Sequence, residues 1–574
     1  MKQFFPLIAF ITLLLNACTE PAGKTSSATP EGGAVMYFNG DIITMEGDQP
    51  QYAEAVVVKD GKIAFVGSKD EAMKAAGKGH QMVDLQGKTM LPGFIDPHSH
   101  FINSLSMSDQ ANCSAPPVGS ASDPDGVIAA LKAFKEKKGI KDGEMLMGYG
   151  YDDSVMPAGN QLNRDQLDQA FPNNPVLVMH VSLHGVVLNS LALKKYGISA
   201  ATKTPPGGVI VRKPGTQEPY GLIMETAYQP VFSQLPKPTP EQLKAQVKAG
   251  QMIYAEAGVT TAQEGASHWG DVKIMQNAAD NGEFFIDVVS YPFITEFDSA
   301  MTRYKTSDFG KYNQHFKLGG IKITIDGSPQ GRTALFTTPY LTGGPGGEKN
   351  WKGEPTYPQD VVNEMLKKVY DNGLQCIFHA NGDGAIDMCI KAHEYASGGD
   401  YSKDRRTTVI HSQFVRPDQL DTYVKENIMA SFYTEHTFFF ADAHIKNRGE
   451  KQASFISPMK SALSKGIKCT NHTDFNVAPI DQMLVIWSAV NRVSRDGKVI
   501  GADERISPYQ ALQAITTSSA YQYFEENSKG SIKAGKLADL VILDQNPLKV
   551  DPMKIKDIKV LETIKEGKSI YKKG

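Results

Sequence analysis

Two histidines separated by a single residue are the first sign of chemistry in this sequence. His98 and His100 end the stretch Leu-Pro-Gly-Phe-Ile-Asp-Pro-His-Ser-His, which begins with a short apolar run at residues 91–95. Side chains two residues apart in a β-strand project from the same face, so both imidazoles can point at one spot. Neutral imidazole is a common ligand for zinc-like ions, so the pair predicts half of a metal site. An isolated His-x-His pair usually has no such role, so the rest of the chain has to decide.

Five further residues with acid–base or metal-binding side chains each lie in or just after a predicted strand. They are Glu264, Lys322, His379, His411 and Asp474. Each one alone has a plain structural alternative, such as a packed core histidine, a turn aspartate or a helix-capping glutamate. Chance would rarely place all of them at successive strand ends, so we interpret them as one site.

Lys322 is the most informative of these residues. It lies in the sequence Ile-Lys-Ile-Thr-Ile-Asp at residues 321–326, where apolar and polar side chains alternate. The isoleucines suit a face packed against helices, which directs Lys322 to the interior. A buried, unpaired ammonium is costly, so Lys322 needs an anionic partner or chemical conversion into an anion. Pairing with Asp326 or Glu264 is the simpler alternative.

The elements that position these residues alternate between strand-like and helix-like segments, as in a parallel α/β fold. We predict a (β/α)8 TIM-like barrel over residues 91–529, in which functional residues gather at the carboxyl ends of the strands. The segment at about residues 101–240 is too long for a single connection between neighbouring barrel strands. We therefore expect it to form an inserted subdomain over the top of the barrel. The predicted barrel strands are residues 91–95, 258–262, 285–290, 320–325, 374–378, 407–410, 428–432 and 467–470.

Both ends of the chain predict short strands instead. Residues 34–90 and 530–574 contain apolar runs separated by turn signals such as Lys59-Asp60-Gly61. Neither end is long enough to hold a good core alone. We therefore expect the two ends to join into one composite β-sandwich that brackets the barrel.

Residues 1–18 predict a lipoprotein-type signal peptide. Their apolar run, residues 4–15, is shorter than the roughly 20 residues needed to span a bilayer. It is followed by Cys18 in the sequence Leu-Asn-Ala-Cys, which resembles a bacterial lipobox and implies lipidation of that thiol. Acyl chains and a flexible tether at residues 19–33 would then hold the protein at a membrane of the bacterial cell envelope. Plain secretion is the alternative.

The composition narrows the class of protein. The chain has 574 residues, 41% hydrophobic and 21% charged, as in a globular protein, and its formal net charge is -3. Binding to nucleic acid needs a concentrated positive field, so we exclude nucleic acid as the main partner.

As a set, His98, His100, Lys322, His379, His411 and Asp474 resemble the metal-binding pattern of the amidohydrolase superfamily. Further stretches resemble its YtcJ-like branch, which includes N-substituted formamide deformylase-like enzymes. The resemblance runs from about Ala34 to the C-terminus. The matching stretches are residues 91–100, 184–190, 219–225, 322–328, 379–383 and 535–543.

This resemblance implies a hydrolase with one or two divalent metal ions per subunit, expected to be Zn2+. The ligands would be His98, His100, His379, His411 and Asp474. Lys322, carboxylated by CO2, would bridge two ions, and Glu264 is the rival bridge. Asp474 would also be catalytic, taking a proton from water and delivering it to the leaving amine. The residues expected to hold the substrate or its oxyanion are His184, Arg332 and His436.

The substrate predicted from this resemblance is a small organic molecule with a carbon–nitrogen bond other than a peptide bond. An N-acyl amine, an N-formyl amine or a cyclic amide would fit. Two alternatives remain open: an ester or phosphoester hydrolase on the same metal site, and a membrane-tethered binding protein that has lost turnover.

Overall fold

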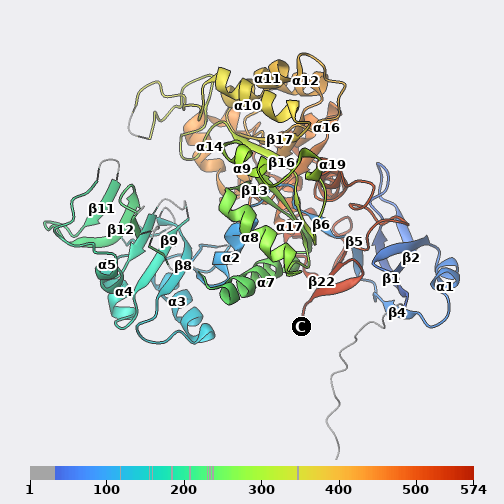
Figure 1. The fold of residues 1–574 in the computed structure, drawn as a ribbon, viewed down its shortest axis with the longest axis horizontal. Coiled ribbons are helices and arrows are strands. Elements are labelled where there is room, and N and C mark those ends of the chain that lie inside the picture. The colour runs from blue at the N-terminus through green and yellow to red at the C-terminus, as the bar shows by residue number, and fades with distance from the viewer. Residues whose placement is uncertain are drawn as a thin grey trace, which may run out of the picture.

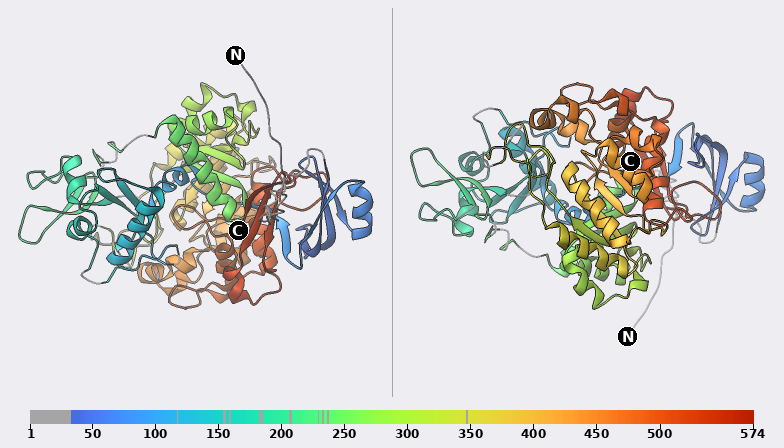
Figure 2. Two further views of the ribbon diagram at one scale, coloured as in Figure 1. Left: turned by 90° about the horizontal axis from the view of Figure 1, so that it is seen from below. Right: turned by 90° about the horizontal axis from the view of Figure 1, so that it is seen from above.

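The computed structural model describes residues 33–574, except residues 117, 154–155, 158–159, 182–184, 206–207, 229, 232–233, 236–237 and 346–347. A central region of parallel strands and helices carries an inserted lobe on one side and a sheet on the opposite side (Figures 1 and 2). The predicted signal peptide, Cys18, nearly all of the tether and His184 lie outside the described residues. Within the described part of the chain, no helix has the length and apolarity that crossing a membrane requires.

The central region contains two parallel sheets whose strands follow one another in sequence order. All eight predicted barrel strands overlap observed strands, which confirms the α/β class, and β15 is an additional short strand. A bridge between Phe293 and Lys322 connects the two sheets. The sheets consist of β6 (Phe94–Ile95), β13 (Val259–Ser267), β14 (Asp287–Pro292) and β15 (Phe316–Leu318), and of β16 (Gly320–Thr324), β17 (Gln375–Ala380), β18 (Thr408–His411), β19 (Met429–Phe432) and β20 (Cys469–Asn471).

Helices connect these strands. α7 (Pro240–Glu256) begins at Thr239, whose side chain accepts a hydrogen bond from the Gln242 amide, with proline at the first helical position. α10 (Gln359–Asp371) buries an apolar stripe of Val362, Leu366 and Val369, at the spacing expected for one helix face. The other helices of this region are α8 (Trp269–Asp280), α9 (Phe297–Met301), α11 (Asp383–Ser397), α12 (Pro417–Glu426), α13 (His436–Phe439), α14 (Ala441–Arg448), α15 (Glu450–Ala453), α16 (Met459–Ser464), α17 (Gln482–Asn491), α18 (Pro508–Ala514) and α19 (Thr517–Gln522).

The predicted first barrel strand is in fact two strands that belong to different sheets. β5 (Thr89–Pro92) pairs with the C-terminal strand β21 (Leu540–Leu543), whereas β6 pairs with β13 in the barrel region. The break falls at Gly93, where a Cβ atom would lie 2.5 Å from Thr260 Cγ2. Only glycine lets the backbone approach Thr260 this closely, so the chain changes sheets at this residue.

Both chain ends join, as expected, but into one mixed sheet. Its strand order is β23-β22-β21-β5-β1-β2-β3, with β4 paired to β1. The described strands do not divide into the two sheets of a sandwich, because β5 pairs with β1 on one side and β21 on the other. The remaining elements of this region are β1 (Val35–Ile43), β2 (Tyr52–Lys59), β3 (Lys62–Gly67), α1 (Lys69–Ala76), β4 (Gln81–Asp84), β22 (Val560–Lys565) and β23 (Lys568–Lys572).

The insertion forms a lobe with its own six-stranded sheet, in the order β11-β12-β10-β9-β8-β7. Separate apolar clusters pack within it, one around Leu131 and Val178 and the other around Leu177 and Ile223. Figures 1 and 2 show the lobe beside the barrel region, on the side away from the terminal sheet. Its elements are β7 (Ala111–Asn112), α3 (Pro124–Lys138), β8 (Leu146–Tyr151), α4 (Arg164–Ala170), β9 (Val176–His180), β10 (Gly185–Leu188), α5 (Ser190–Lys195), β11 (Gly208–Arg212) and β12 (Pro219–Glu225). The preceding helix α2 (Phe101–Met107) packs instead against α7 and β13 of the barrel region.

Candidate metal centre

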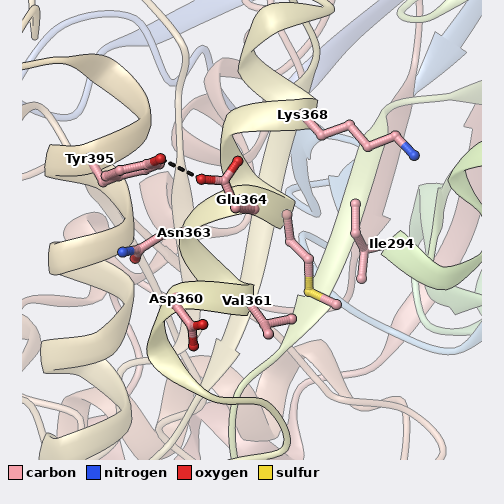
Figure 3. Close-up of a pocket in the computed structure, with 8 residues that line it drawn as sticks. Ile294, Asp360, Val361, Asn363, Glu364, Lys368 and Tyr395 are labelled. Carbon is pink, nitrogen blue, oxygen red and sulfur yellow. Dashed lines mark hydrogen bonds between the residues drawn. The ribbon is translucent and has the colours of Figure 1, made fainter.

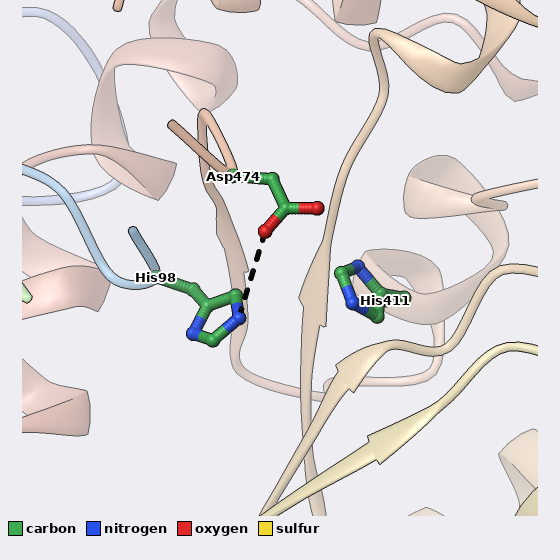
Figure 4. Close-up of side chains that lie close together, drawn as sticks. All are labelled: His98, His411 and Asp474. Atoms are coloured by element: carbon green, nitrogen blue, oxygen red, sulfur yellow. Dashed lines mark ion pairs between the residues drawn. The ribbon is translucent and has the colours of Figure 1, made fainter. Parts of the chain in front are cut away.

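The histidines and the aspartate predicted at the strand ends converge. His98 follows β6, His411 is the last residue of β18, and Asp474 follows β20 (Figure 4). One side-chain ligand atom from each of these three residues lies within 4.8 Å of the other two. His98 Nε2 is 3.7 Å and His100 Nε2 is 3.4 Å from Asp474 Oδ1. Two imidazoles and a carboxylate therefore face one point, with the His100 imidazole on the same carboxylate oxygen, a donor set that suits a zinc-like ion.

His379 extends this cluster along the sheet. It lies on β17, next to His411 on β18, and its Nδ1 is 3.1 Å from His411 Nε2. Two ring nitrogens at this separation suit a shared ligand position or a hydrogen bond between the rings. The side chains of His100 and His379 are each 22% exposed, so solvent reaches the cluster from their side.

The electrostatic environment keeps most of these imidazoles neutral. Burial holds the pKa of His98 and of His411 well below the usual range and lowers that of His379 to about 3. Burial alone would lower the pKa of His100 too, but the hydrogen bond and charge of Asp474 raise it. Burial alone would raise the pKa of Asp474, yet the surrounding histidines hold it well below its usual range. Neutral rings and an ionised carboxylate are the forms that bind metal.

Lys322 is buried in this cluster, as the alternation in its strand predicted. Its side chain is among the largest fully buried ones, and its Nζ has no hydrogen-bond partner among the described residues. Burial lowers the pKa of its ammonium to about 8, against the attraction of Asp474 and Glu264. The simpler alternative of a pair with Asp326 is wrong. That carboxylate accepts instead from the backbone amides of Leu335, Asn381 and Gly382.

Glu264 lies next to His100, and each of its oxygens accepts one backbone hydrogen bond. Oε2 accepts from the Ile102 amide at 2.7 Å and Oε1 from the Ala266 amide at 3.2 Å. Ile102 is in the first turn of α2, whose N-cap is His100, so Glu264 satisfies a free amide at that helix terminus. Its present role is therefore to fix the loop that carries His100.

The substrate-binding candidates have different surroundings. His436 is buried, its ring centroid is 5.9 Å from that of His411, and its Nδ1 has no partner among the described residues. Arg332 lies on the long loop after β16, where its carbonyl accepts from Trp351 Nε1 at 2.6 Å. None of the described contacts joins Arg332 to the histidine cluster, and His184 cannot be placed.

Two residues of this region, His472 and Glu435, were given no role from the sequence, although His472, like Asp474, lies at the end of the last predicted strand. His472 Nε2 lies 3.2 Å from His411 Nδ1, and Ser431 Oγ lies 2.9 Å from His472 Nδ1, so a buried polar chain extends behind His411. Glu435 is fully buried and neither carboxylate oxygen has a partner among the described residues. Burial raises its pKa well above the usual range. Glu435 lies three residues after the predicted strand 428–432, so the strand-end criterion that singled out Glu264 could have found it.

A second group of possible ligands is occupied by lysines. Asp287, at the start of β14, His315 and Glu566, between β22 and β23, approach one another. However, Lys529 Nζ lies 2.5 Å and Lys565 Nζ 2.7 Å from Asp287 Oδ2. Two buried ammonium groups oppose a cation there, so we interpret this group as part of a structural ion network.

A hollow of about 610 Å³ lies away from the histidine cluster, on the outer helices. It is open to solvent between α10, α11 and the short 3-10 helix η2 (Ile294–Glu296), and Tyr395 donates a hydrogen bond to Glu364 at its edge (Figure 3). None of the converging histidines lines it. The residues that line it are Ile294, Asp360, Val361, Asn363, Glu364, Met365, Lys368 and Tyr395.

Comparison with known proteins gives the family and supports the fold. The profile of the Amidohydrolase family matches residues 81–571. The YtcJ protein of Bacillus subtilis (strain 168) is 28% identical over 555 residues, covering 94% of this chain and 99% of that protein. N-substituted formamide deformylase of Arthrobacter pascens is 24% identical over 551 residues, covering 94% and 98%. An uncharacterized metal-dependent hydrolase from Pyrococcus horikoshii OT3 has the same fold, with a TM-score of 0.71 and 22% identity over 91% of this chain and 99% of that one.

Proposed function

Because the chain belongs to the amidohydrolase family, we propose that it is a metal-dependent hydrolase that cleaves a carbon–nitrogen bond other than a peptide bond. The substrate would be a small organic amide: an N-acyl amine, an N-formyl amine or a cyclic amide. The observation that carries the proposal is the convergence of His98, His411 and Asp474 on one point, with His100 beside Asp474. The similarity to a protein named N-substituted formamide deformylase supports the choice of an amide.

The residues present fit a divalent metal, with Zn2+ as the proposed ion. His98, His100 and Asp474 would hold one ion, and His379 and His411 would hold a second. When bound, such an ion acts as a Lewis acid that lowers the pKa of water from about 16 toward 7 and polarises the substrate carbonyl. The neutral state of His98, His379 and His411 leaves each ring a lone pair for this purpose.

Lys322 is the proposed bridge between the two ions, after carboxylation of its Nζ by CO2. A carbamate is an anion, so this modification would remove the unpaired buried ammonium and supply two oxygen donors. Glu264 is the weaker candidate, since both of its oxygens already accept from backbone amides. Lys322 is therefore favoured as the bridge, because its buried Nζ has no hydrogen-bond partner among the described residues.

Asp474 is the proposed catalytic acid–base residue. Its carboxylate is held ionised beside His98 and His100, so it can accept a proton from the attacking water. The same oxygen would then deliver that proton to the leaving amine. His436 is the proposed contact for the substrate or its oxyanion, because its free Nδ1 lies close to the cluster. Arg332, on the loop after β16, and His184 are further candidates.

We also propose that the protein acts at the bacterial cell envelope. Residues 1–18 would direct export, and lipidated Cys18 would anchor the mature protein to a membrane. Labelling with a radioactive or alkyne-tagged fatty acid tests this, with Cys18→Ser as the control. Equal label in both proteins would rule out the anchor.

Metal analysis and a substrate screen test the enzymatic proposal. Purified protein should hold one or two equivalents of metal, and His98→Ala and Asp474→Ala should each hold less. The metal-loaded protein should hydrolyse members of an amide and formamide library faster than lactones or phosphotriesters. A wild-type protein without stoichiometric metal would refute the hydrolase, and preference for lactones or phosphotriesters would refute the amide substrate.

A further inference from the structure

We infer that Gln263 and Tyr523 are positioning residues of the metal centre, which hold His98 in one tautomer and one orientation. The inference rests on the proposed metal-dependent function and adds the C-terminal segment of the chain to its machinery. His98 Nδ1 lies 2.6 Å from Gln263 Oε1. All three side chains are buried, so water does not compete for this contact.

The surroundings of Gln263 fix which way its amide points. Gln263 Nε2 lies 2.7 Å from the carbonyl oxygen of Pro97, which can only accept a hydrogen bond. The amide nitrogen must therefore face Pro97, and the amide oxygen must face His98. That oxygen can only accept, so the proton of His98 is on Nδ1. Nε2, the atom that faces Asp474, keeps its lone pair for a metal.

Tyr523 completes the arrangement from a position 260 residues further along the chain. Its hydroxyl accepts from Gln263 Nε2 at 2.8 Å and donates to the carbonyl oxygen of Asp96 at 2.8 Å. Asp96 and Pro97 lead directly into His98, so one hydroxyl holds both the amide and the backbone behind this ligand. A phenylalanine would fill the same volume but would make neither hydrogen bond.

Tyr523 is itself held firmly. It follows α19 and packs in a buried apolar cluster with residues from four barrel strands. Its carbonyl accepts from Lys317 Nζ at 3.2 Å, and the neighbouring Gln522 donates from Nε2 to Pro97 at 2.8 Å. The cluster consists of Ile95, Val289, Tyr291, Ile377, Ile410, Ala520 and Tyr523. The segment after α19 therefore lies beneath the metal centre and joins it to the far end of the sequence.

Groups that fix the orientation and tautomer of a ligating histidine raise the metal affinity of its site. Their removal typically lowers that affinity 10–100-fold. Tyr523→Phe removes one hydroxyl and keeps the ring. Gln263→Met removes the acceptor for His98 and keeps a side chain of similar length. Both variants should therefore bind metal about 10–100-fold more weakly than the wild type.

Tyr291→Phe is the matched control. Tyr291 is also buried, its ring centroid is 6.4 Å from that of Tyr523, and its hydroxyl donates to Gln375 at 2.7 Å. This hydroxyl does not contact His98 or its supports, so Tyr291→Phe should resemble Tyr523→Phe in thermal stability without the metal but keep wild-type metal affinity.

The experiment is chelator competition with Zn2+ on full-length wild type and the three variants, together with visible spectra of the Co2+-substituted proteins. We expect weaker Zn2+ binding and a shifted Co2+ spectrum in Tyr523→Phe and Gln263→Met only. Unchanged affinity and spectrum in Tyr523→Phe would overturn the inference while leaving the proposed function intact. A loss of Zn2+ affinity in Tyr291→Phe equal to that in Tyr523→Phe would also overturn the inference. A wild type that binds no metal would overturn the proposed function and this inference with it.

Discussion

Gly265 lies so close to His98 that no larger residue fits between them. A Cβ atom on Gly265 would be 2.3 Å from His98 Cε1 and 2.4 Å from His98 Nδ1. Cβ atoms essentially never approach other atoms that closely, so the imidazole would have to move. The position of the first predicted metal ligand thus depends on the absence of a side chain on the neighbouring strand β13.

Gly265→Ala should therefore lower the metal affinity of the protein by at least tenfold, because the displaced ring also loses its hydrogen bond to Gln263. Gly270→Ala is the control, since a Cβ there meets nothing within 4 Å and the residue is exposed on α8. The control should bind metal like the wild type and unfold at the same or a slightly higher temperature. Equal metal affinities of Gly265→Ala and Gly270→Ala would show that the ring adapts.

Lys322→Ala and Glu264→Ala should separate the two candidate bridges. If carboxylated Lys322 joins two ions, Lys322→Ala should lose about half of the bound metal and most of the activity. Short carboxylic acids should restore part of the bound metal and part of the activity, by occupying the space left by the Lys322 side chain. Glu264→Ala should instead lower stability by about 1 kcal/mol or more, because two partly buried amides lose their acceptor. Metal content by mass spectrometry and denaturant unfolding measure these effects, and full activity in Lys322→Ala would refute the bridge.

Asp474→Asn should reduce kcat by about 10²–10⁴-fold, since the amide cannot accept and return a proton. The loss should appear mainly in kcat rather than in KM, because the residue acts on the water and the leaving amine. Bound metal should fall less than in His98→Ala, since an amide oxygen can still coordinate. A variant that keeps wild-type kcat on the best amide substrate would exclude Asp474 as the acid–base residue.

His393 should make stability depend on pH away from the metal centre. Its buried ring donates from Nε2 to the Glu426 carbonyl and accepts at Nδ1 from Tyr370. Burial lowers its pKa from 6.5 to about 4. The unfolded ring takes up a proton as the pH falls through 6.5, whereas the folded ring resists until about pH 4. Stability present above pH 6.5 is therefore lost progressively toward pH 4, by on the order of 3 kcal/mol.

Urea unfolding at pH 7 and pH 4.5 measures this effect. The wild type should lose more unfolding free energy over that range than His393→Gln, which has no titrating group at this position. His268→Gln, on the exposed end of α8, should behave like the wild type. An identical pH dependence in the wild type and His393→Gln would contradict the prediction.

The sequence predicted the barrel strands well because each is a short apolar run bounded by helical or turn segments. It failed at residues 91–95, where it predicted one strand through Pro92 and Gly93 although the chain changes sheet there. Leu91 pairs with Val541, whereas Phe94 pairs with Val259, and the apolar residues on either side of the break do not reveal these different partners. The sandwich was mispredicted for a related reason: pairing between strands far apart in sequence leaves no local trace.

The candidate site could be predicted for the same reason as the strands. His98, His379, His411 and Asp474 each lie shortly after an apolar run that predicts a strand. Lys322 stood out because a charged residue in a buried strand needs an explanation. The support behind His98 could not be foreseen. Gln263 and Tyr523 are of unremarkable types, and only the folded chain brings them together.

The sheet that joins both chain ends sets the order in which this protein can mature. Strands β1 to β5 leave the ribosome first, yet β5 keeps an open edge until β21, about 450 residues later, has been made. Tyr523 also emerges late, so His98 receives its support only when translation is nearly complete. We therefore expect the complete metal site to form, and to bind metal, only after synthesis is finished. If the chain is exported, metal binding would occur in the compartment in which the chain finally folds.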